Sequence, residues 1–101
     1  IEKRRIELIF GISYADDMRK AKEVLLKVVT ADPRVLKDPA PMVAVKELGE
    51  SSVNLVCRPW VKPQDYWDVY FDVVEKGKLA LEQNGMHIPF PQQDVHLFNE
   101  K

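Results

Sequence analysis

The spacing of apolar residues switches between a period of two and a period of about 3.6 along this chain, and the order of these segments restricts the fold. In the first segment every second residue is apolar: Ile6, Leu8, Phe10 and Ile12. This alternation predicts a half-buried strand over Arg5–Ile12. Apolar residues then recur at helical spacing, which predicts a helix from Asp16 to about Ala31. Asp32-Pro33 ends this helix, because proline pushes the preceding residue out of helical geometry.

A β-hairpin is predicted in the middle of the chain. Val35–Pro41 contains two prolines and is typical of a loop. Two strand-like segments follow, Met42–Leu48 and Ser51–Val61, and only the short turn Gly49-Glu50 separates them. Two strand patterns joined by so short a turn indicate an antiparallel hairpin.

A second helix and a fourth strand complete the pattern. The helix is expected to begin at Pro63 or Asp65 and to run to about Asn84. Gly85 stops it, since glycine is common just past a helix end. The apolar segment Met86–Phe90 then predicts a fourth strand.

The order strand–helix–strand–strand–helix–strand is that of the ferredoxin-like βαββαβ sandwich. This α+β fold class has an antiparallel sheet with two helices on one face. A chain of 101 residues is long enough for one modest core and too short for two. We therefore assign residues 1–90 to the ferredoxin-like domain and residues 91–101 to a C-terminal extension.

The extension carries a strand pattern with no partner left in the sequence. Val95 and Leu97 alternate with His96, which predicts a short tail strand. Pro89 and Pro91 lie before it and mark where the sheet of the domain stops, because proline donates no ladder hydrogen bond.

Charge and motif content argue against several functions. Lys and Arg number 15 and Asp and Glu number 16, so the positive field of a nucleic-acid-binding protein is missing. An RNA-recognition module needs aromatic residues on its central strands, but "SSVNLVCRPW" has none before Trp60. A phosphatase of the acylphosphatase type would need an arginine in the loop after the first strand, and "GISYADD" has none.

The residues that carry enzyme or metal chemistry are sparse. Cys57 lies among apolar residues and is expected to pack as a small buried hydrophobe, since a catalytic thiol needs a positioned base. The two histidines, His87 and His96, form no metal-ligand spacing with each other or with the cysteine. We expect no enzymatic activity, no metal and no cofactor. No uncharged apolar run approaches the roughly 18–20 residues of a membrane span.

The second helix is apolar over an arc wider than a surface helix needs to cover its core. Trp67 and Phe71 lie at one margin of this arc, and aromatic residues are enriched in interface cores. One hypothesis places them against another subunit, and the alternative packs them on the first helix or a loop. Asp68, Asp72 and Glu75 lie on the opposite side and are expected to form a solvated face.

Three segments together resemble one family. They are "RRIELIFGISYADD", "RPWVKPQDYWDVYFDVVEKGKLALEQNG" and "IPFPQQDVHL", and they are similar to the C-terminal cytoplasmic domain of the bacterial small-conductance mechanosensitive channel (MscS) family. The resemblance covers nearly the whole chain, and "VKELGESSVNLV" resembles the central hairpin of the family. The chain begins at Ile1, which fits a part of a longer protein.

The resemblance implies a role for the tail strand. Channels of this family are homoheptamers whose cytoplasmic parts enclose a vestibule, and the last strand of each subunit joins a small parallel β-barrel. By this resemblance the barrel strand comprises Asp94, Val95, His96, Leu97 and Phe98. A closed barrel satisfies the backbone groups that a lone strand would leave unpaired.

The resemblance also implies the function of the whole protein. We expect the vestibule and assembly domain of a channel on the cytoplasmic side of the bacterial inner membrane. Such a channel opens under membrane tension and releases ions and small solutes during hypo-osmotic shock. The alternative is a ferredoxin-like regulatory module that binds a small molecule, and a sevenfold ring would distinguish the channel from a metabolite-binding dimer. An enzyme would lose turnover on Cys57→Ser.

Overall fold

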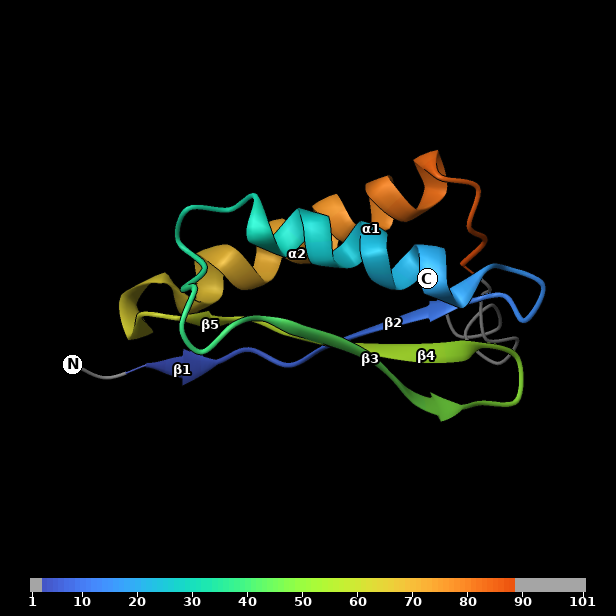
Figure 1. The fold of residues 1–101 in the computed structure, drawn as a ribbon, viewed down its shortest axis with the longest axis horizontal. Helices are drawn as coiled ribbons and strands as arrows, with labels where there is room; N and C mark the ends of the chain where they lie inside the picture. Colours follow the sequence, from blue (N-terminus) through green and yellow to red (C-terminus); the bar gives the residue numbers. More distant parts are fainter. Residues whose placement is uncertain (1–2, 89–101) are drawn as a thin grey trace, which may run out of the picture.

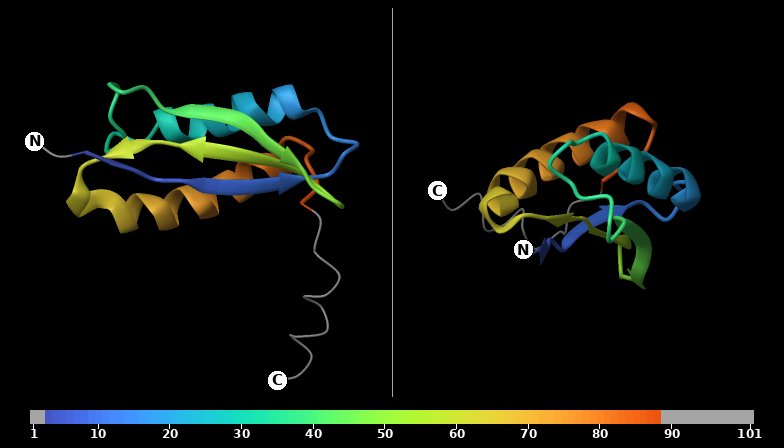
Figure 2. Two further views of the ribbon diagram at one scale, coloured as in Figure 1. Left: turned by 90° about the horizontal axis from the view of Figure 1, so that it is seen from below. Right: turned by 60° about the vertical axis from the view of Figure 1, so that its left-hand side comes forward.

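Two helices cover one face of an antiparallel sheet in the computed structural model, which describes residues 3–88 (Figure 1). The three-stranded part of the sheet has the order β2–β4–β3. Its strands are β2 (Leu8–Ile12), β3 (Met42–Leu48) and β4 (Val53–Arg58), all paired antiparallel. Seen from below, the sheet lies in front of both helices (Figure 2). The fold class is therefore confirmed as α+β with both helices on one face.

The first and third predicted strands are each interrupted once. β1 (Arg4–Arg5) pairs with β5 (Trp60–Val61) as a separate two-stranded ladder. Pro59 separates β4 from β5 and has no backbone N–H for the ladder. Its carbonyl still accepts a hydrogen bond from the Ile6 N–H at 2.9 Å. The two ladders are therefore parts of one strand pair that is broken at the proline.

The predicted hairpin is confirmed, with an irregularity that the sequence did not indicate. Val45 lies opposite Leu55, whereas Glu47 lies opposite Asn54, so a β-bulge leaves Lys46 without a cross-strand partner. A bulge bends its strand and increases the local twist. The end of the β3–β4 hairpin accordingly curves away from the helices (Figure 1).

Both helices lie close to their predicted bounds. α1 spans Met18–Thr30. The Asp17 carboxylate at its N-terminus accepts hydrogen bonds from the backbone N–H groups of Arg19 and Lys20. α2 spans Tyr66–Gln83 and follows a single 3-10 turn, η1 (Pro63–Asp65). Gly85 has a φ of +86°, a conformation that glycine adopts without steric cost just beyond a helix.

The predicted fourth strand over Met86–Phe90 is not present at residues 86–88, and residues 89 and 90 lie outside the described residues. One backbone bond, from the Ser13 N–H to the His87 carbonyl at 2.8 Å, joins this segment to the end of β2. The His87 N–H donates to the Asp16 carboxylate. The Asp16 side chain thus takes the place of the backbone carbonyl that would accept a hydrogen bond from His87 in a strand. The predicted tail strand, Asp94–Phe98, also lies outside the described residues.

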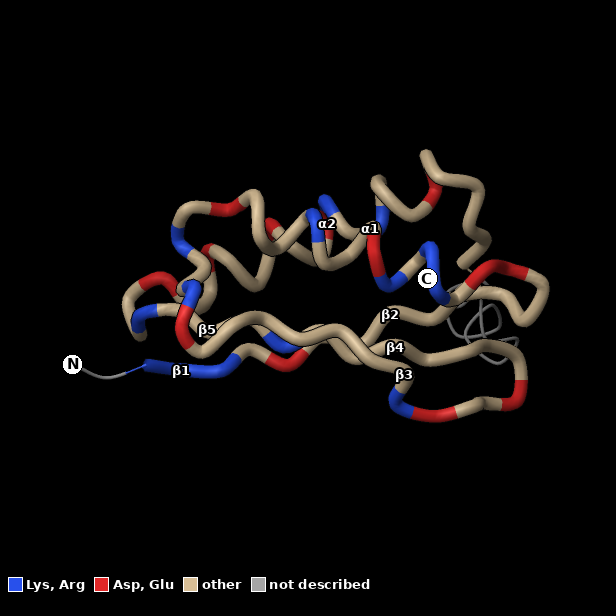
Figure 3. The backbone as a smooth tube through the Cα atoms, viewed as in Figure 1, with Lys and Arg blue, Asp and Glu red and all other residues tan. Residues whose placement is uncertain are grey.

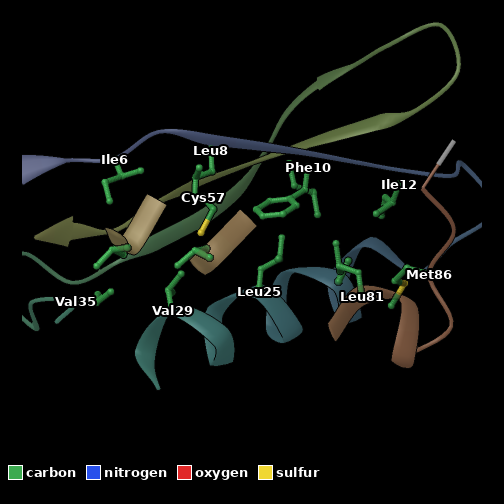
Figure 4. Close-up of a cluster of buried hydrophobic side chains, with 14 of the residues drawn as sticks. Ile6, Leu8, Phe10, Ile12, Leu25, Val29, Val35, Cys57, Leu81 and Met86 are labelled. Atoms are coloured by element: carbon green, nitrogen blue, oxygen red, sulfur yellow. The ribbon is translucent and has the colours of Figure 1, made fainter. Parts of the chain in front are cut away.

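The core lies between the sheet and the two helices (Figure 4). Leu8, Phe10 and Ile12 point from β2 toward Leu25 of α1 and Leu81 of α2. All five side chains are less than a tenth exposed.

One glycine sets the distance between α2 and the sheet. A Cβ on Gly77 would lie 2.7 Å from the Phe10 ring and 3.2 Å from a methyl group of Leu25. Real Cβ atoms essentially never approach a carbon at 2.7 Å. α2 therefore packs this close because Gly77 has no side chain.

We predict that Gly77→Ala lowers the free energy of unfolding by about 1–3 kcal/mol, because the added methyl group displaces the Phe10 ring. Urea denaturation followed by circular dichroism measures the change. Glu75→Ala on the exposed side of α2 is the control and should change stability by less than about 0.5 kcal/mol. Helix propensity alone would make Gly77→Ala stabilising by about 1 kcal/mol, and that result would contradict the packing argument.

A buried carboxylate anchors the segment that leads to the tail. Asp16 is 5% exposed at its side chain. It accepts hydrogen bonds from the backbone N–H groups of Ser13 and His87, and its Oδ1 lies 3.0 Å from the His87 Nδ1. Burial opposes ionisation of this carboxyl, but the bonds from the His87 backbone and ring outweigh it, so the pKa of Asp16 is lowered.

We predict that Asp16→Ala lowers the free energy of unfolding by about 1–3 kcal/mol at pH 7, because two backbone N–H groups lose their acceptor. The lowered pKa makes this contribution complete above the ordinary value of 3.8, and the contribution is lost as pH falls through the folded-state pKa. Denaturation at several pH values should show that the difference in free energy of unfolding between wild type and variant becomes smaller in acid. A difference in unfolding free energy that stays constant with pH would contradict an ionised Asp16. The control is Glu50→Ala, at an exposed position.

Candidate assembly surface

The outer side of α2 exposes a row of large apolar side chains. Trp67 is 57% exposed, Phe71 is 61% exposed and Val74 is 42% exposed. We call these three residues the aromatic ridge. Burial of α2 is confined to the face that carries Val69, Val73, Gly77 and Leu81.

Contacts between aromatic rings on α2 hold the ridge in place. The Trp67 and Phe71 rings stack with centroids 5.8 Å apart, and Tyr66 packs edge-on against Trp67 at 4.9 Å. Tyr66 and Tyr70 are partly buried and reach the core. The Arg4 guanidinium lies 4.2 Å from the Tyr66 ring centroid, within the range of a cation–π contact. Side chains ordered in this way lose less entropy when a partner covers them.

An ion-pair network joins the end of α1 to α2. The Arg34 Nη2 donates to Asp32 Oδ2 at 2.8 Å and to Asp72 Oδ2 at 2.7 Å. The bonds from Arg34 outweigh the effect of burial and lower the pKa of Asp32. Asp72 was expected on a solvated face, and its side chain is 45% exposed. The prediction did not include its pairing with Arg34, which the loop after α1 brings to it. Asp68 and Glu75 are exposed, as predicted.

A second charged cluster lies on the face of the sheet that no helix covers. Glu7 accepts a hydrogen bond from Arg58 at 3.0 Å and lies within 4.0 Å of Arg5 and Lys46. The bond from Arg58 holds the pKa of Glu7 below its ordinary value. Sequence reasoning missed this cluster, because its members are far apart along the chain. The alternation of the strands would have indicated it only once the register Leu8 opposite Cys57 was known.

The structure places the cysteine considered for catalysis in the core. Cys57 is fully buried in the core, and this burial raises the pKa of its thiol to about 12. The thiol thus packs as a hydrophobe. Over residues 3–88 no cluster of three or more His, Cys, Asp or Glu could hold a metal ion. Nor does that part of the chain contain a helix that is long and apolar enough to cross a membrane.

Open grooves lie on both sides of α1. One, of about 600 Å³, lies between the two helices, and Lys76 and Leu79 line it from α2. The other, of about 340 Å³, lies on the opposite side of α1, where Leu26 meets Val43 of β3. We call the second one the α1–β3 groove.

The predicted site residues divide into two groups. Trp67 and Phe71 lie together on the exposed ridge. The predicted barrel residues, Asp94, Val95, His96, Leu97 and Phe98, lie outside the described residues. Their role in assembly stays a prediction.

Comparisons with known proteins agree with the resemblance. The family model for "Mechanosensitive ion channel MscS, C-terminal" matches residues 6–88. A small-conductance mechanosensitive channel of Edwardsiella ictaluri is 47% identical over 96 residues, which are 95% of this chain and 34% of that protein. An uncharacterized MscS family protein of Archaeoglobus fulgidus is 43% identical over 97 residues, which are 96% of this chain and 34% of that protein.

A solved structure shows the same fold. The crystal structure of Helicobacter pylori MscS in its closed state matches with a TM-score of 0.81 and 29% sequence identity. The match covers 87% of this chain and 35% of that one. This chain thus spans about a third of the length of the curated relatives that it matches. The chain belongs to the MscS family of mechanosensitive ion channels and represents its C-terminal domain.

Proposed function

We propose that this chain is the cytoplasmic vestibule and assembly domain of a homoheptameric channel in the bacterial inner membrane. The channel opens under membrane tension and releases ions and small solutes during hypo-osmotic shock. The observation that carries this proposal is the family match, which covers residues 6–88. The chain itself contributes a scaffold around the path of the solutes, and the pore belongs to other parts of the protein.

The exposed apolar surface supports a role in assembly. Trp67 and Phe71 are each more than half exposed, although burying one such side chain gains about 1.5–3 kcal/mol. Monomeric proteins seldom leave rigid aromatic clusters in water, and such patches commonly mark interfaces. In the assembled channel, Trp67 and Phe71 contact a neighbouring subunit.

The tail supplies a second contact between subunits. Residues Asp94–Phe98 form the barrel strand in this proposal, with Val95 and Leu97 on one face and His96 and Phe98 on the other. The Asp16–His87 contact fixes the point from which the tail departs. Identical strands around a rotation axis pair side by side through heterologous contacts, and the closed barrel leaves no unpaired strand edge.

We predict that deleting residues 94–101 from the full-length protein weakens or abolishes the heptamer, because the barrel loses its strands. Native mass spectrometry measures the stoichiometry of the intact and truncated proteins. Patch-clamp recording of both proteins in liposomes tests whether suction on the membrane opens a conductance. The truncated protein should keep the circular dichroism signal of the folded domain, since the deletion keeps every core residue described within residues 3–88.

The control is replacement of residues 99–101 by Gly and Ser, which leaves the barrel strand in place. Intact protein that is dimeric and saturates with a metabolite would favour the regulatory-module alternative and contradict the channel. Truncated heptamers that resist dissociation as well as intact ones would contradict the barrel and leave the channel proposal standing.

A further inference from the structure

The two long flanks of the domain differ in shape. Figure 2 shows α1 beside β3 on one flank and α2 beside β2 on the other. Lys76 and Leu79 of α2 line the groove toward α1. At 100° per residue, Trp67 and Phe71 lie on the other side of α2 and therefore face away from α1. One flank thus carries the aromatic ridge, and the opposite flank carries the α1–β3 groove.

The α1–β3 groove combines apolar side chains with charged ones, as a binding surface for an apolar ridge would. Leu26 of α1, which is 40% exposed, and Val43 of the edge strand β3 line the groove. Three charged side chains surround these apolar residues: Arg19, Lys22 and Glu23. Basic side chains next to an apolar groove can also approach the faces of aromatic rings in cation–π contacts.

Two carboxylates adjoin the ridge, and two of the three charged side chains that line the groove are basic. Asp68 and Glu75 adjoin the ridge on α2, and Arg19 and Lys22 adjoin the groove on α1. None of these four takes part in an ion pair within residues 3–88. Both sets lie in the helix layer of the molecule (Figure 3). Two copies placed side by side would bring the acidic set of one against the basic set of the other.

We propose that the aromatic ridge of one subunit docks in the α1–β3 groove of the next copy of this chain. Because the two surfaces differ and lie on opposite flanks, the contact is heterologous and repeats around a ring. Trp67 and Phe71 cover Leu26 and Val43, while Asp68 and Glu75 pair with Arg19 and Lys22. This inference rests on the proposed function, since it specifies how the subunits of that ring meet.

Cysteine cross-linking tests the geometry. Leu26→Cys and Phe71→Cys are introduced together into the full-length protein, from which other reactive cysteines have been removed. Cys57 is kept, because it is fully buried. Mild oxidation should then produce a ladder of covalent oligomers up to the complete ring on a non-reducing gel, since docking brings the two Cα atoms near the roughly 4.4–6.8 Å that a disulfide needs.

The single variants are the matched controls. Neither Leu26→Cys nor Phe71→Cys alone should cross-link, because a heterologous contact never places a residue against its own copy. Dimers from Phe71→Cys alone would show ridge against ridge and overturn the proposal. So would the absence of a ladder from the double variant in a ring that is otherwise intact. A protein that forms no ring at all would overturn the proposed function as well, so native mass is measured on the same samples.

Charge exchange tests the complementarity without a cross-link. Asp68→Lys with Glu75→Lys places like charges in contact and should raise the dissociation constant of the ring roughly tenfold at low salt. Adding Arg19→Glu and Lys22→Glu should restore assembly. Restoration by Lys20→Glu and Lys27→Glu, on the side of α1 away from the groove, would show a net-charge effect and overturn the pairing. Failure of the groove exchange to restore assembly would also overturn it.

Discussion

The close packing of α2 on the sheet determines which surfaces this domain leaves uncovered. Gly77 lets the helix approach until its backbone lies against Phe10, which turns Val69, Val73 and Leu81 inward. The ridge then lies on the flank of α2 that faces away from α1. Exposure of Trp67 follows from this packing, and a rotation of α2 that covered it would withdraw the residues that complete the core.

The energetics explain why such a ridge suits a ring. One large aromatic side chain gains about 1.5–3 kcal/mol when it is buried, whereas association of two free molecules costs an estimated 4–15 kcal/mol. A single ridge-to-groove contact is therefore too weak to hold two free domains together. Contacts that repeat around a ring, with the rest of each channel already holding the domains close, act at a high effective concentration. In the proposed ring, the barrel strand of the tail and the ridge would reinforce each other.

The sequence predicted the elements better than their contacts. Periodicity gave both helices and the hairpin, because one-sided burial leaves a regular pattern in apolar residues. The bulge at Lys46 and the Asp16–His87 contact depend on register and on tertiary placement. The Arg34–Asp72 ion pair was missed for the same reason, since Arg34 comes from a loop whose path the sequence does not specify. The helical pattern placed Trp67 and Phe71 at the margin of the apolar arc of α2 but left open whether the first helix or a loop covers them. It gave no indication of the groove on the opposite flank.

The central claim is that another copy of this chain covers the ridge. Quenching of tryptophan fluorescence by acrylamide tests it directly, in a full-length protein where Trp67 is the only tryptophan because Trp60 and any others are replaced by Phe. Trp67 is 57% exposed in this domain, so the free 101-residue chain should be quenched readily. We predict quenching several-fold weaker in the assembled protein. Equal quenching in the two states would contradict the account.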